Sequence, residues 1–453
     1  MEVFRQVIVM TSTLQSNLKR ALLCSCLPLL ISCGGSSGST NTGGDLDVPD
    51  SGSCSVGEEK NYFLNYMRDD YFWYQDIPSN VDTGNYNDVY QLLDGIRSPV
   101  DRFSFILTQE QYEQRYINAE YIGFGFSTRV SGSRLFINYV YEDSPATSVG
   151  MTRGAEILSI DGTSVASLIA NNQLNDAFGA AQSGVTRTLR WRAVNQTERE
   201  SVLTKQAVET NTVLATQSFA LDGKAIGYYV LNSFINRTGS DLNDAYNQLA
   251  GVDELIIDVR YNGGGIIKYG VQAATQAAGN NVIGNTAVQL RYNDKNTDNN
   301  KAYLFELGEG IQQLNLDRVF VLTTGASCST SELIINSLTP YVDVVVIGQP
   351  TCGKPVGQSP DRFCDKISFV INFETVNANG EGRYFDGLPV TCPATDSIVG
   401  DWGAENDPLL LQARHFISYG SCRPQASGGV QQASVTHRVD EPMTLPEQWK
   451  REF

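Results

Sequence analysis

The sequence predicts an α/β protein whose main sheet has parallel strands, and two observations support this. Within residues 207–422, short apolar runs such as Ile226–Leu231, Leu255–Arg260 and Val319–Leu322 alternate with helical patterns. Strands that alternate with helices are typical of a sheet with parallel strands. In addition, turns rich in glycine or serine follow two of these runs, and the carboxyl ends of the strands are where such sheets place their sites.

Charge and histidine content exclude several classes of function. The chain has 453 residues, enough for more than one domain, and a formal net charge of -17. Such an acidic chain lacks the basic surface that nucleic acids need, so we expect no nucleic-acid partner. It has only two histidines, His415 and His437. A Ser-His-Asp triad and a histidine-rich metal site are therefore both unlikely, and we expect neither a metal nor a cofactor.

Residues 1–33 have the features of a targeting segment. Lys19 and Arg20 precede the apolar run Ala21–Ile31, and Cys33 follows it closely. This arrangement resembles a bacterial lipoprotein signal, in which Cys33 would be lipidated and become the first mature residue. A plain signal peptide or a short membrane anchor is the alternative, and translation could start at Met1 or Met10. Residues 34–54 are rich in small polar residues and predict a flexible linker.

Three further regions can be separated by composition. Residues 55–118 predict a helical domain with an aromatic-rich face, and we expect it to serve packing without contributing chemistry. Residues 119–206 change to short strands and turns. Residues 423–453 are polar, lack periodicity and predict a loose tail.

The strand-rich region resembles a PDZ domain of the kind found in bacterial proteases. The resemblance rests on the start of a short helix at Ser144 and on the run Arg153–Gly162, a strand with a turn. In PDZ domains, backbone N–H groups of one loop hold the carboxylate of a peptide, and the peptide adds a strand to the sheet edge. An unrelated small β domain is the alternative. The matching loop here consists of Ile122, Gly123, Phe124 and Gly125.

The stretch from Val319 to Gln358 carries the strongest functional signal. It reads as a strand, a small-residue turn, a helix, a second strand and a loop that contains Lys354. Ser329 lies in the turn, where a helix start leaves N–H groups available. Ser329 and Glu332 also have capping-box spacing, so Ser329 could simply cap the helix.

A serine nucleophile in this chain needs a base other than histidine. Lys354 qualifies if burial lowers its pKa, although a single lysine is usually a solvated surface charge. Cys328 could be taken for the nucleophile instead, but it lacks a histidine partner.

The remaining cysteines are expected to form some disulfides in an oxidising compartment. Connectivity cannot be deduced from sequence. We expect the pairs that bracket the loop after Lys354 and the last helix, which would leave Cys54 and Cys328 unpaired. The members of these two pairs are Cys352 with Cys364 and Cys392 with Cys422.

Four separated motifs, which follow one another along the chain in the family's order, resemble those of the C-terminal processing peptidases, also called tail-specific proteases. The resemblance covers roughly residues 58–420. The family's serine motif matches residues 327–332, which places the nucleophile at Ser329. Its Gly-Lys loop places the base at Lys354, and a glutamine that orients the base matches Gln358. Its Asp-Leu-Arg-x-Asn-x-Gly-Gly run matches residues 258–265. The two amides of the oxyanion hole would then come from Gly264 and Thr330.

This chain departs from the family pattern at a few positions that remove no catalytic group. Cys328 and Thr330 replace alanines, Gly263 replaces a common proline, and Pro355 follows the lysine. These changes put the preferred substrate in doubt more than the activity.

The resemblance implies an α/β core of the ClpP/crotonase-like kind and a serine endopeptidase with a Ser/Lys dyad. It would act on proteins with free, disordered C-termini, held by the PDZ domain. A lipid anchor would attach it to a membrane facing the periplasm. The residue after Cys33 is Gly34, whereas lipoproteins retained in the inner membrane can have an aspartate at this position. The glycine therefore favours the outer membrane. An adaptor protein or a second copy are further partners we consider. The competing hypothesis is a non-catalytic PDZ lipoprotein that acts as a peptide-binding adaptor.

Overall fold

The computed structural model describes residues 54–113 and 120–424. The predicted signal with Cys33, nearly all of the predicted linker and nearly all of the predicted tail lie outside these residues. Within the described part of the chain, no helix is both long enough and apolar enough to cross a membrane.

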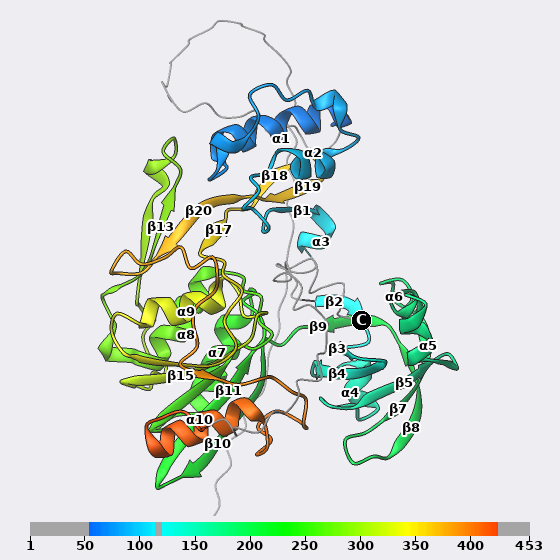
Figure 1. Ribbon diagram of the computed structural model, residues 1–453, viewed down its shortest axis with the longest axis vertical. Helices are drawn as coiled ribbons and strands as arrows, with labels where there is room; N and C mark the ends of the chain where they lie inside the picture. The colour runs from blue at the N-terminus through cyan, green and yellow to red at the C-terminus, as the bar shows by residue number, and fades with distance from the viewer. Residues whose placement is uncertain (1–53, 114–119, 425–453) are drawn as a thin grey trace, which may run out of the picture. The chain divides into compact units, whose positions relative to one another are not determined.

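A six-stranded sheet forms the centre of the α/β core (Figure 1). Its strands from β11 to β21 run parallel, and β10 joins one edge antiparallel to β11. The predicted parallel sheet is therefore confirmed. In spatial order the strands are β10 (Val213–Leu221), β11 (Lys224–Leu231), β12 (Glu254–Asp258), β15 (Arg318–Thr323), β16 (Asp343–Gly348) and β21 (Cys392–Pro393).

Helices cover both faces of this sheet (Figure 1). Side chains alternate along β12, so that Leu255 and Ile257 join one core cluster and Ile256 joins the other. Both faces are thus buried, which is why the strands read as continuous apolar runs. Three helices pack on the first face and one on the second: α7 (Thr238–Gln248), α8 (Ile267–Ala278) and α9 (Thr330–Leu338), against α10 (Pro408–Tyr419).

Of two smaller sheets, a three-stranded one brings early and late parts of the chain together, and a four-stranded one joins residues 286–304 to residues 356–376. The N-terminal helices lead into a short strand that pairs with a late strand, Phe105 opposite Phe369. The region expected to be a purely helical domain therefore contributes a strand next to residues 361–369. The elements are α1 (Val56–Asp70), α2 (Val89–Ile96), α3 (Gln109–Tyr112), the sheet β1 (Phe105–Thr108), β19 (Lys366–Phe369) and β18 (Asp361–Phe363), and the sheet β14 (Lys301–Leu304), β13 (Thr286–Tyr292), β20 (Ile371–Val376) and β17 (Val356–Gln358).

Residues 120–209 form a β-rich unit with a core of its own, centred on Trp191, Phe124 and Phe126. Its main sheet has β3 at one edge and β8 at the other. A separate pair, β2 with β9, connects it to the rest of the chain. The elements are β2 (Glu120–Gly123), β3 (Phe126–Ser131), β4 (Arg134–Val140), α4 (Pro145–Ser148), β5 (Glu156–Ile160), β6 (Thr163–Ser164), α5 (Val165–Ala170), α6 (Leu174–Phe178), β7 (Thr186–Arg192), β8 (Glu198–Thr204) and β9 (Gln206–Glu209).

Three disulfides join the cysteines of the described chain, and they differ from the expected set. The structure pairs Cys392 with Cys422, which is one of the predicted pairs. The predicted Cys352–Cys364 pair is wrong, because Cys352 bonds to Cys328 and Cys364 bonds to Cys54. Closeness in sequence was misleading here. The loop of Cys352 folds back onto the serine turn, whereas Cys364 lies in the β18–β19 hairpin beside the start of α1.

Candidate active site

The serine motif at the turn between β15 and α9 contains three serines. Two of them hydrogen-bond to backbone carbonyls, and the third faces a cavity. Ser327 Oγ donates to Val259 O at 2.7 Å and Ser331 Oγ donates to Asn262 O at 2.9 Å. Ser329 instead lines a cavity of about 290 Å³. Of the three serines in the motif, Ser329 is therefore the one placed to meet a ligand.

The backbone of Ser329 is unusual for a helix cap. Its φ is 56° and its ψ is -113°, whereas a residue that only caps a helix is normally extended. Non-glycine residues with such positive φ values cost about 1–3 kcal/mol and cluster at functional sites. This geometry favours the nucleophile interpretation over simple capping.

Lys354 lines the same cavity and is buried, with 8% of its surface exposed. Burial lowers the pKa of Lys354 from 10.5 to about 8, while the charges of Asp101 and Glu332 act in the opposite direction. Its Nζ donates to Gln358 Oε1 at 2.8 Å, and Gln358 Nε2 in turn donates to Phe103 O at 2.8 Å. Lys354 is thus not a solvated surface charge, and Gln358 fixes the position of its amine.

Glu332 connects the serine turn to the lysine loop. One carboxylate oxygen accepts the N–H of Ser329 at 2.7 Å and that of Lys354 at 2.9 Å. The other oxygen accepts the N–H of Gly353 at 2.8 Å and the hydroxyl of Thr351 at 2.6 Å. Burial raises the pKa of Glu332 and these hydrogen bonds oppose the rise. Glu332 therefore holds the serine turn and the lysine loop together through their backbones.

The glycine run after β12 lies against Ser329, but its amides are not arranged as predicted. A Cβ on Gly264, whose φ is 104°, would lie 2.7 Å from Ser329 Cβ, so only glycine fits there. The N–H of Gly264 donates to Asn262 Oδ1 at 2.9 Å. This amide, predicted for the oxyanion hole, is thus used within its own turn. Gly265 and Thr330 line the cavity, and among the described residues the N–H of neither has a hydrogen-bond acceptor.

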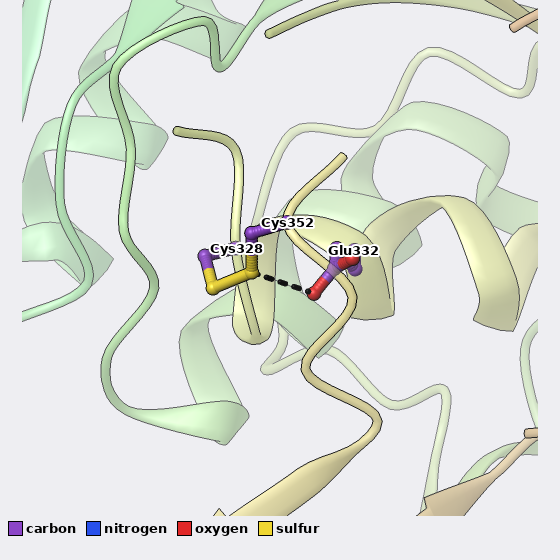
Figure 2. Close-up of side chains that lie close together, drawn as sticks. All are labelled: Cys328, Glu332 and Cys352. Carbon is purple, nitrogen blue, oxygen red and sulfur yellow. Dashed lines mark hydrogen bonds between the residues drawn. A yellow bond between two sulfur atoms is a disulfide. The ribbon is translucent and has the colours of Figure 1, made fainter. Parts of the chain in front are cut away.

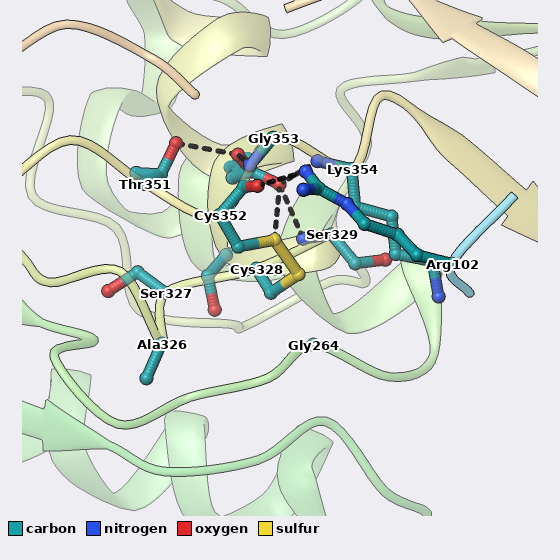
Figure 3. Close-up of a disulfide and its surroundings, with 12 residues drawn as sticks. Arg102, Gly264, Ala326, Ser327, Cys328, Ser329, Thr351, Cys352, Gly353 and Lys354 are labelled. Atoms are coloured by element: carbon teal, nitrogen blue, oxygen red, sulfur yellow. Dashed lines mark hydrogen bonds between the residues drawn. A yellow bond between two sulfur atoms is a disulfide. The ribbon is translucent and has the colours of Figure 1, made fainter. Parts of the chain in front are cut away.

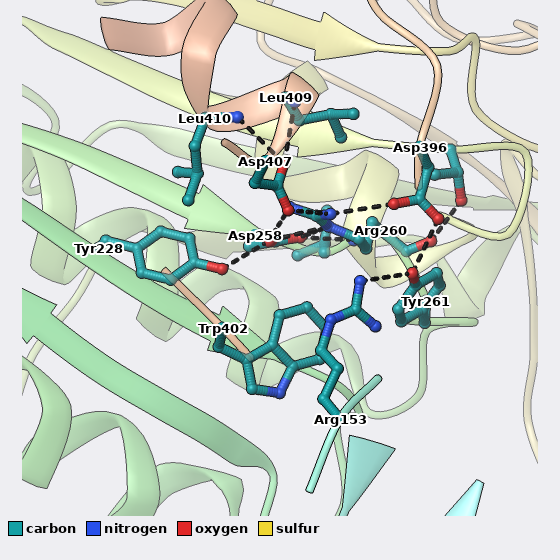
Figure 4. A network of polar contacts seen from close by, with 12 residues as sticks. Arg153, Tyr228, Asp258, Arg260, Tyr261, Asp396, Trp402, Asp407, Leu409 and Leu410 are labelled. Carbon is teal, nitrogen blue, oxygen red and sulfur yellow. Dashed lines mark hydrogen bonds and ion pairs between the residues drawn. The ribbon is translucent and has the colours of Figure 1, made fainter. Parts of the chain in front are cut away.

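A buried ion cluster holds the start of the glycine run (Figure 4). Arg260, fully buried, pairs with Asp258 at 2.7 Å, with Asp396 at 3.0 Å and with Asp407 at 2.8 Å. Burial alone would raise the pKa of Asp396, but the charges of Arg260 and other arginines outweigh it and lower that pKa. Tyr261 donates to Asp396 as well, at 2.8 Å. Residues 258–261 are therefore fixed immediately before the glycines.

The walls of the cavity are mainly apolar. They include Ile266, Leu290, Leu333, Val356 and Phe373, from four different elements and the loop before α8. An apolar wall beside a serine and a lysine can accommodate an uncharged side chain of a substrate.

One group of side chains in the described chain has the spacing of metal ligands: Cys328, Glu332 and Cys352 (Figure 2). Their ligand atoms lie within 4.8 Å of one another. However, the two sulfurs are bonded to each other, and metals bind thiolates. In this form the group is a disulfide beside a carboxylate.

Comparison with known proteins identifies two regions of this chain as parts of a peptidase family. Residues 225–387 match the family described as Peptidase family S41, and residues 58–105 match the Peptidase S41 N-terminal domain. The chain thus carries a peptidase domain of family S41 together with the N-terminal domain of that family. The predicted kinship with the C-terminal processing peptidases is thereby confirmed.

Several relatives of this S41 chain are known. A carboxyl-terminal-processing protease of Synechocystis is 24% identical over 295 residues, which cover 63% of this chain and 66% of that protein. A carboxy-terminal processing protease of Bacillus subtilis, CtpA, is 24% identical over 345 residues, 74% of this chain and 69% of that protein. The chain thus spans about two thirds of the length of these relatives. A crystal structure from Bacteroides fragilis, described as an S41 protease, has a TM-score of 0.65 and 25% identity, and covers 79% of this chain and 97% of its own.

Three residues of the S41 N-terminal region contribute to the site and were missed from the sequence. Asp101 affects the pKa of Lys354, Phe103 O accepts from Gln358, and Arg102 Nη2 donates to Cys352 O at 2.8 Å. They follow the helices of a region expected to serve packing only. The signal that could have found them is the short polar run Asp-Arg-Phe-Ser between a helix and a strand.

Proposed function

We propose that this S41 protein is a serine endopeptidase that cleaves proteins near unstructured C-terminal tails by a Ser/Lys dyad. The observation that carries the proposal is the buried lysine, with a pKa of about 8, in the same cavity as a serine of strained backbone. A neutral amine is the base that a serine nucleophile requires when no histidine is at hand.

The site residues divide the chemistry among them. Lys354 takes the proton of Ser329 Oγ as that oxygen attacks the scissile carbonyl, and then gives the proton to the leaving amine. In this structure Nζ hydrogen-bonds to Gln358, which holds the amine at the cavity that Ser329 also lines. The N–H groups of Thr330 and Gly265, which have no acceptor within the described part of the chain, are the donors we assign to the oxyanion. Water then hydrolyses the acyl-enzyme.

The β-rich unit is, in this proposal, a PDZ domain that holds the C-terminus of the substrate. The stretch Ile122–Gly125 consists of the end of β2 and a turn that leads directly into β3, which is an edge strand and can accept a peptide as an added strand. The carbonyls of Phe124 and Gly125 accept the N–H groups of Ala146 and Tyr141, which anchors the loop in the fold.

We place the protein in the cell envelope, anchored by a lipid on Cys33 and facing the periplasm. Of the two membranes, we favour the outer membrane over the inner membrane. Three disulfides in the described chain support an oxidising compartment. The partners would be proteins with free, disordered C-termini.

Cleavage of casein by the wild type, by Ser329→Ala and by Lys354→Ala tests the proposal. We expect both variants to lose activity and Ser240→Ala, at an exposed helix position, to keep it. Equal activity in the wild type and Ser329→Ala would overturn the assignment. No activity in any protein, with binding of peptides retained, would favour the non-catalytic adaptor. Peptides with a free or an amidated C-terminus would then test the PDZ role, since the amide removes the carboxylate that the loop should hold.

A further inference from the structure

The disulfide between Cys328 and Cys352 lies inside the proposed dyad (Figure 3). Cys328 immediately precedes the nucleophile Ser329, and Cys352 lies two residues before the base Lys354. The bond therefore joins the two segments that must hold their reactive atoms in register. Neither of the other two disulfides includes a residue of these segments.

Weaker contacts join the same two segments. Cys352 N–H donates to Ser327 O at 3.0 Å, and Glu332 accepts the N–H groups of Ser329 and Lys354. Arg102 holds the carbonyl of Cys352 from the N-terminal region. These contacts are reversible hydrogen bonds, whereas the disulfide is covalent. The disulfide is thus the covalent link between the segments of Ser329 and Lys354, and thiol chemistry can break it.

We propose that the Cys328–Cys352 disulfide is a positioning bond for the Ser/Lys dyad, so that the peptidase is fully active only when this bond is oxidised. The proposal rests on the function proposed above. In the reductive step a dithiol supplies two electrons and two protons. The S–S bond breaks, Cys328 and Cys352 become thiols, and the dithiol becomes a disulfide.

The surroundings of Cys352 suggest how reduction would act. Its Sγ lies 3.6 Å from the Glu332 oxygen that accepts the N–H groups of Ser329 and Lys354. A new thiol there can donate its proton to the same oxygen and compete with these two amides. The carboxylate also favours the thiol over the thiolate, because two negative charges would otherwise meet in a buried place.

Loosening the loop would also expose the base. Lys354 has its low pKa because it is buried, and a loop freed from the serine turn lets water reach the amine. The pKa would then rise and less of the lysine would be neutral near pH 7. A disulfide with a purely structural role would not move this titration.

The test compares oxidised and reduced protein with a peptide substrate, after dithiothreitol treatment and with free thiols counted by alkylation and mass spectrometry. Both cysteines are nearly buried, 4% and 7% exposed, so slow reduction is expected and the thiol count decides the state. When Cys328 and Cys352 are reduced, we expect kcat to fall about ten- to a hundredfold, as misplacement of about 1 Å can cost. KM should change little, and the acidic limb of the kcat profile should move to higher pH.

Two double variants separate this bond from the other disulfides. Cys328→Ser with Cys352→Ser should reproduce the reduced wild type even without reductant, while Cys392→Ser with Cys422→Ser should keep the kcat and pH profile of the oxidised enzyme. Circular dichroism checks that each variant is folded. Unchanged kcat and pH profile in the folded Cys328/Cys352 variant, or in wild type shown to have lost this bond, would overturn the inference while leaving the peptidase assignment intact. Absence of Ser329-dependent cleavage by the oxidised wild type would instead overturn the proposed function.

Discussion

The pH dependence of cleavage tests whether Lys354 is the base. The lysine must be neutral to accept the proton of Ser329, so activity should rise with pH through the pKa of Lys354. Burial places that pKa at about 8. We therefore expect kcat/KM, which reports the free enzyme, to rise with pH with a midpoint near 8.

The structure gives the size of the effect. Lowering the pKa from 10.5 to about 8 corresponds to about 3 kcal/mol in favour of the neutral amine. At pH 7 roughly one lysine in ten is then neutral, against roughly one in three thousand for an exposed lysine. The surroundings of Lys354, in which burial outweighs the charges of Asp101 and Glu332, would thus make the neutral base about three hundred times more available.

Asp101→Asn changes this pKa without touching the dyad. The charge of Asp101 raises the pKa of Lys354, so its removal should move the midpoint of kcat/KM to lower pH. Asparagine is similar in shape, and the hydroxyls of Tyr71 and Ser104, which now donate to Oδ2, can rotate to accept from its amide. The assay is the pH profile of peptide cleavage for wild type and variant. The assignment of Lys354 as the base would be refuted if kcat/KM of the wild type stayed constant between about pH 6 and 9. It would also be refuted if the midpoint of kcat/KM moved to higher pH in Asp101→Asn.

Three further changes test the surroundings of the dyad. Gly264→Ala should abolish cleavage because its Cβ would lie 2.7 Å from the nucleophile's Cβ, whereas Gly223→Ala, also at positive φ but with open space, should keep it; equal cleavage would contradict the close packing. Arg260→Met leaves buried Asp258 and Asp407 without their cation and Asp396 with Arg129 alone, so urea unfolding should show a loss of about 3–5 kcal/mol of stability. A loss under about 1 kcal/mol would contradict the role of these ion pairs. Cys54→Ser removes the disulfide that closes a loop of 310 residues, and Cys422→Ser removes the one that closes a loop of 30 residues. Cys54→Ser should therefore lose about 2 kcal/mol more stability in urea unfolding, and the reverse order would show that loop entropy does not set the difference.

The meeting of the serine turn and the lysine loop could be predicted from the sequence. Both follow apolar runs that read as parallel strands, and the carboxyl ends of neighbouring parallel strands lie together. The structure shows β15 and β16 as neighbours, with Thr323 opposite Gly348. A turn after one and a loop after the other must then be close, which is where Ser329 and Lys354 lie.

Contacts between distant segments could not be predicted in this way. Arg102 contacts the backbone of Cys352, 250 residues away, and no local pattern marks that contact. The burial that lowers the pKa of Lys354 likewise depends on how separate elements pack. The pairing of Cys352 with Cys328 follows from the fold of the loop, and spacing along the chain indicated a different partner. The hydrogen bond from Gly264 to Asn262 is a detail of one turn that the glycine motif leaves open.

The spacing of Ser329 and Glu332 is that of a helix cap, and through the same geometry Glu332 holds both segments of the proposed dyad. Its carboxylate accepts two hydrogen bonds at each oxygen, one from Ser329, one from Thr351 and two from the lysine loop.

Glu332→Gln tests this role, because the amide would point its own donors at two backbone or hydroxyl donors. Leaving two buried donors unpaired costs about 2–6 kcal/mol, so the variant should unfold at lower urea concentration. If it folds, kcat should fall more than KM changes, since the dyad loses its alignment while the apolar cavity stays. Thr351→Val serves as the comparison, because it removes one donor to Glu332 and the acceptor of the Leu388 N–H but keeps the charge of Glu332. It should lose less stability and less kcat than Glu332→Gln. Wild-type kcat in a folded Glu332→Gln would show that the disulfide and the strands hold the dyad without this carboxylate.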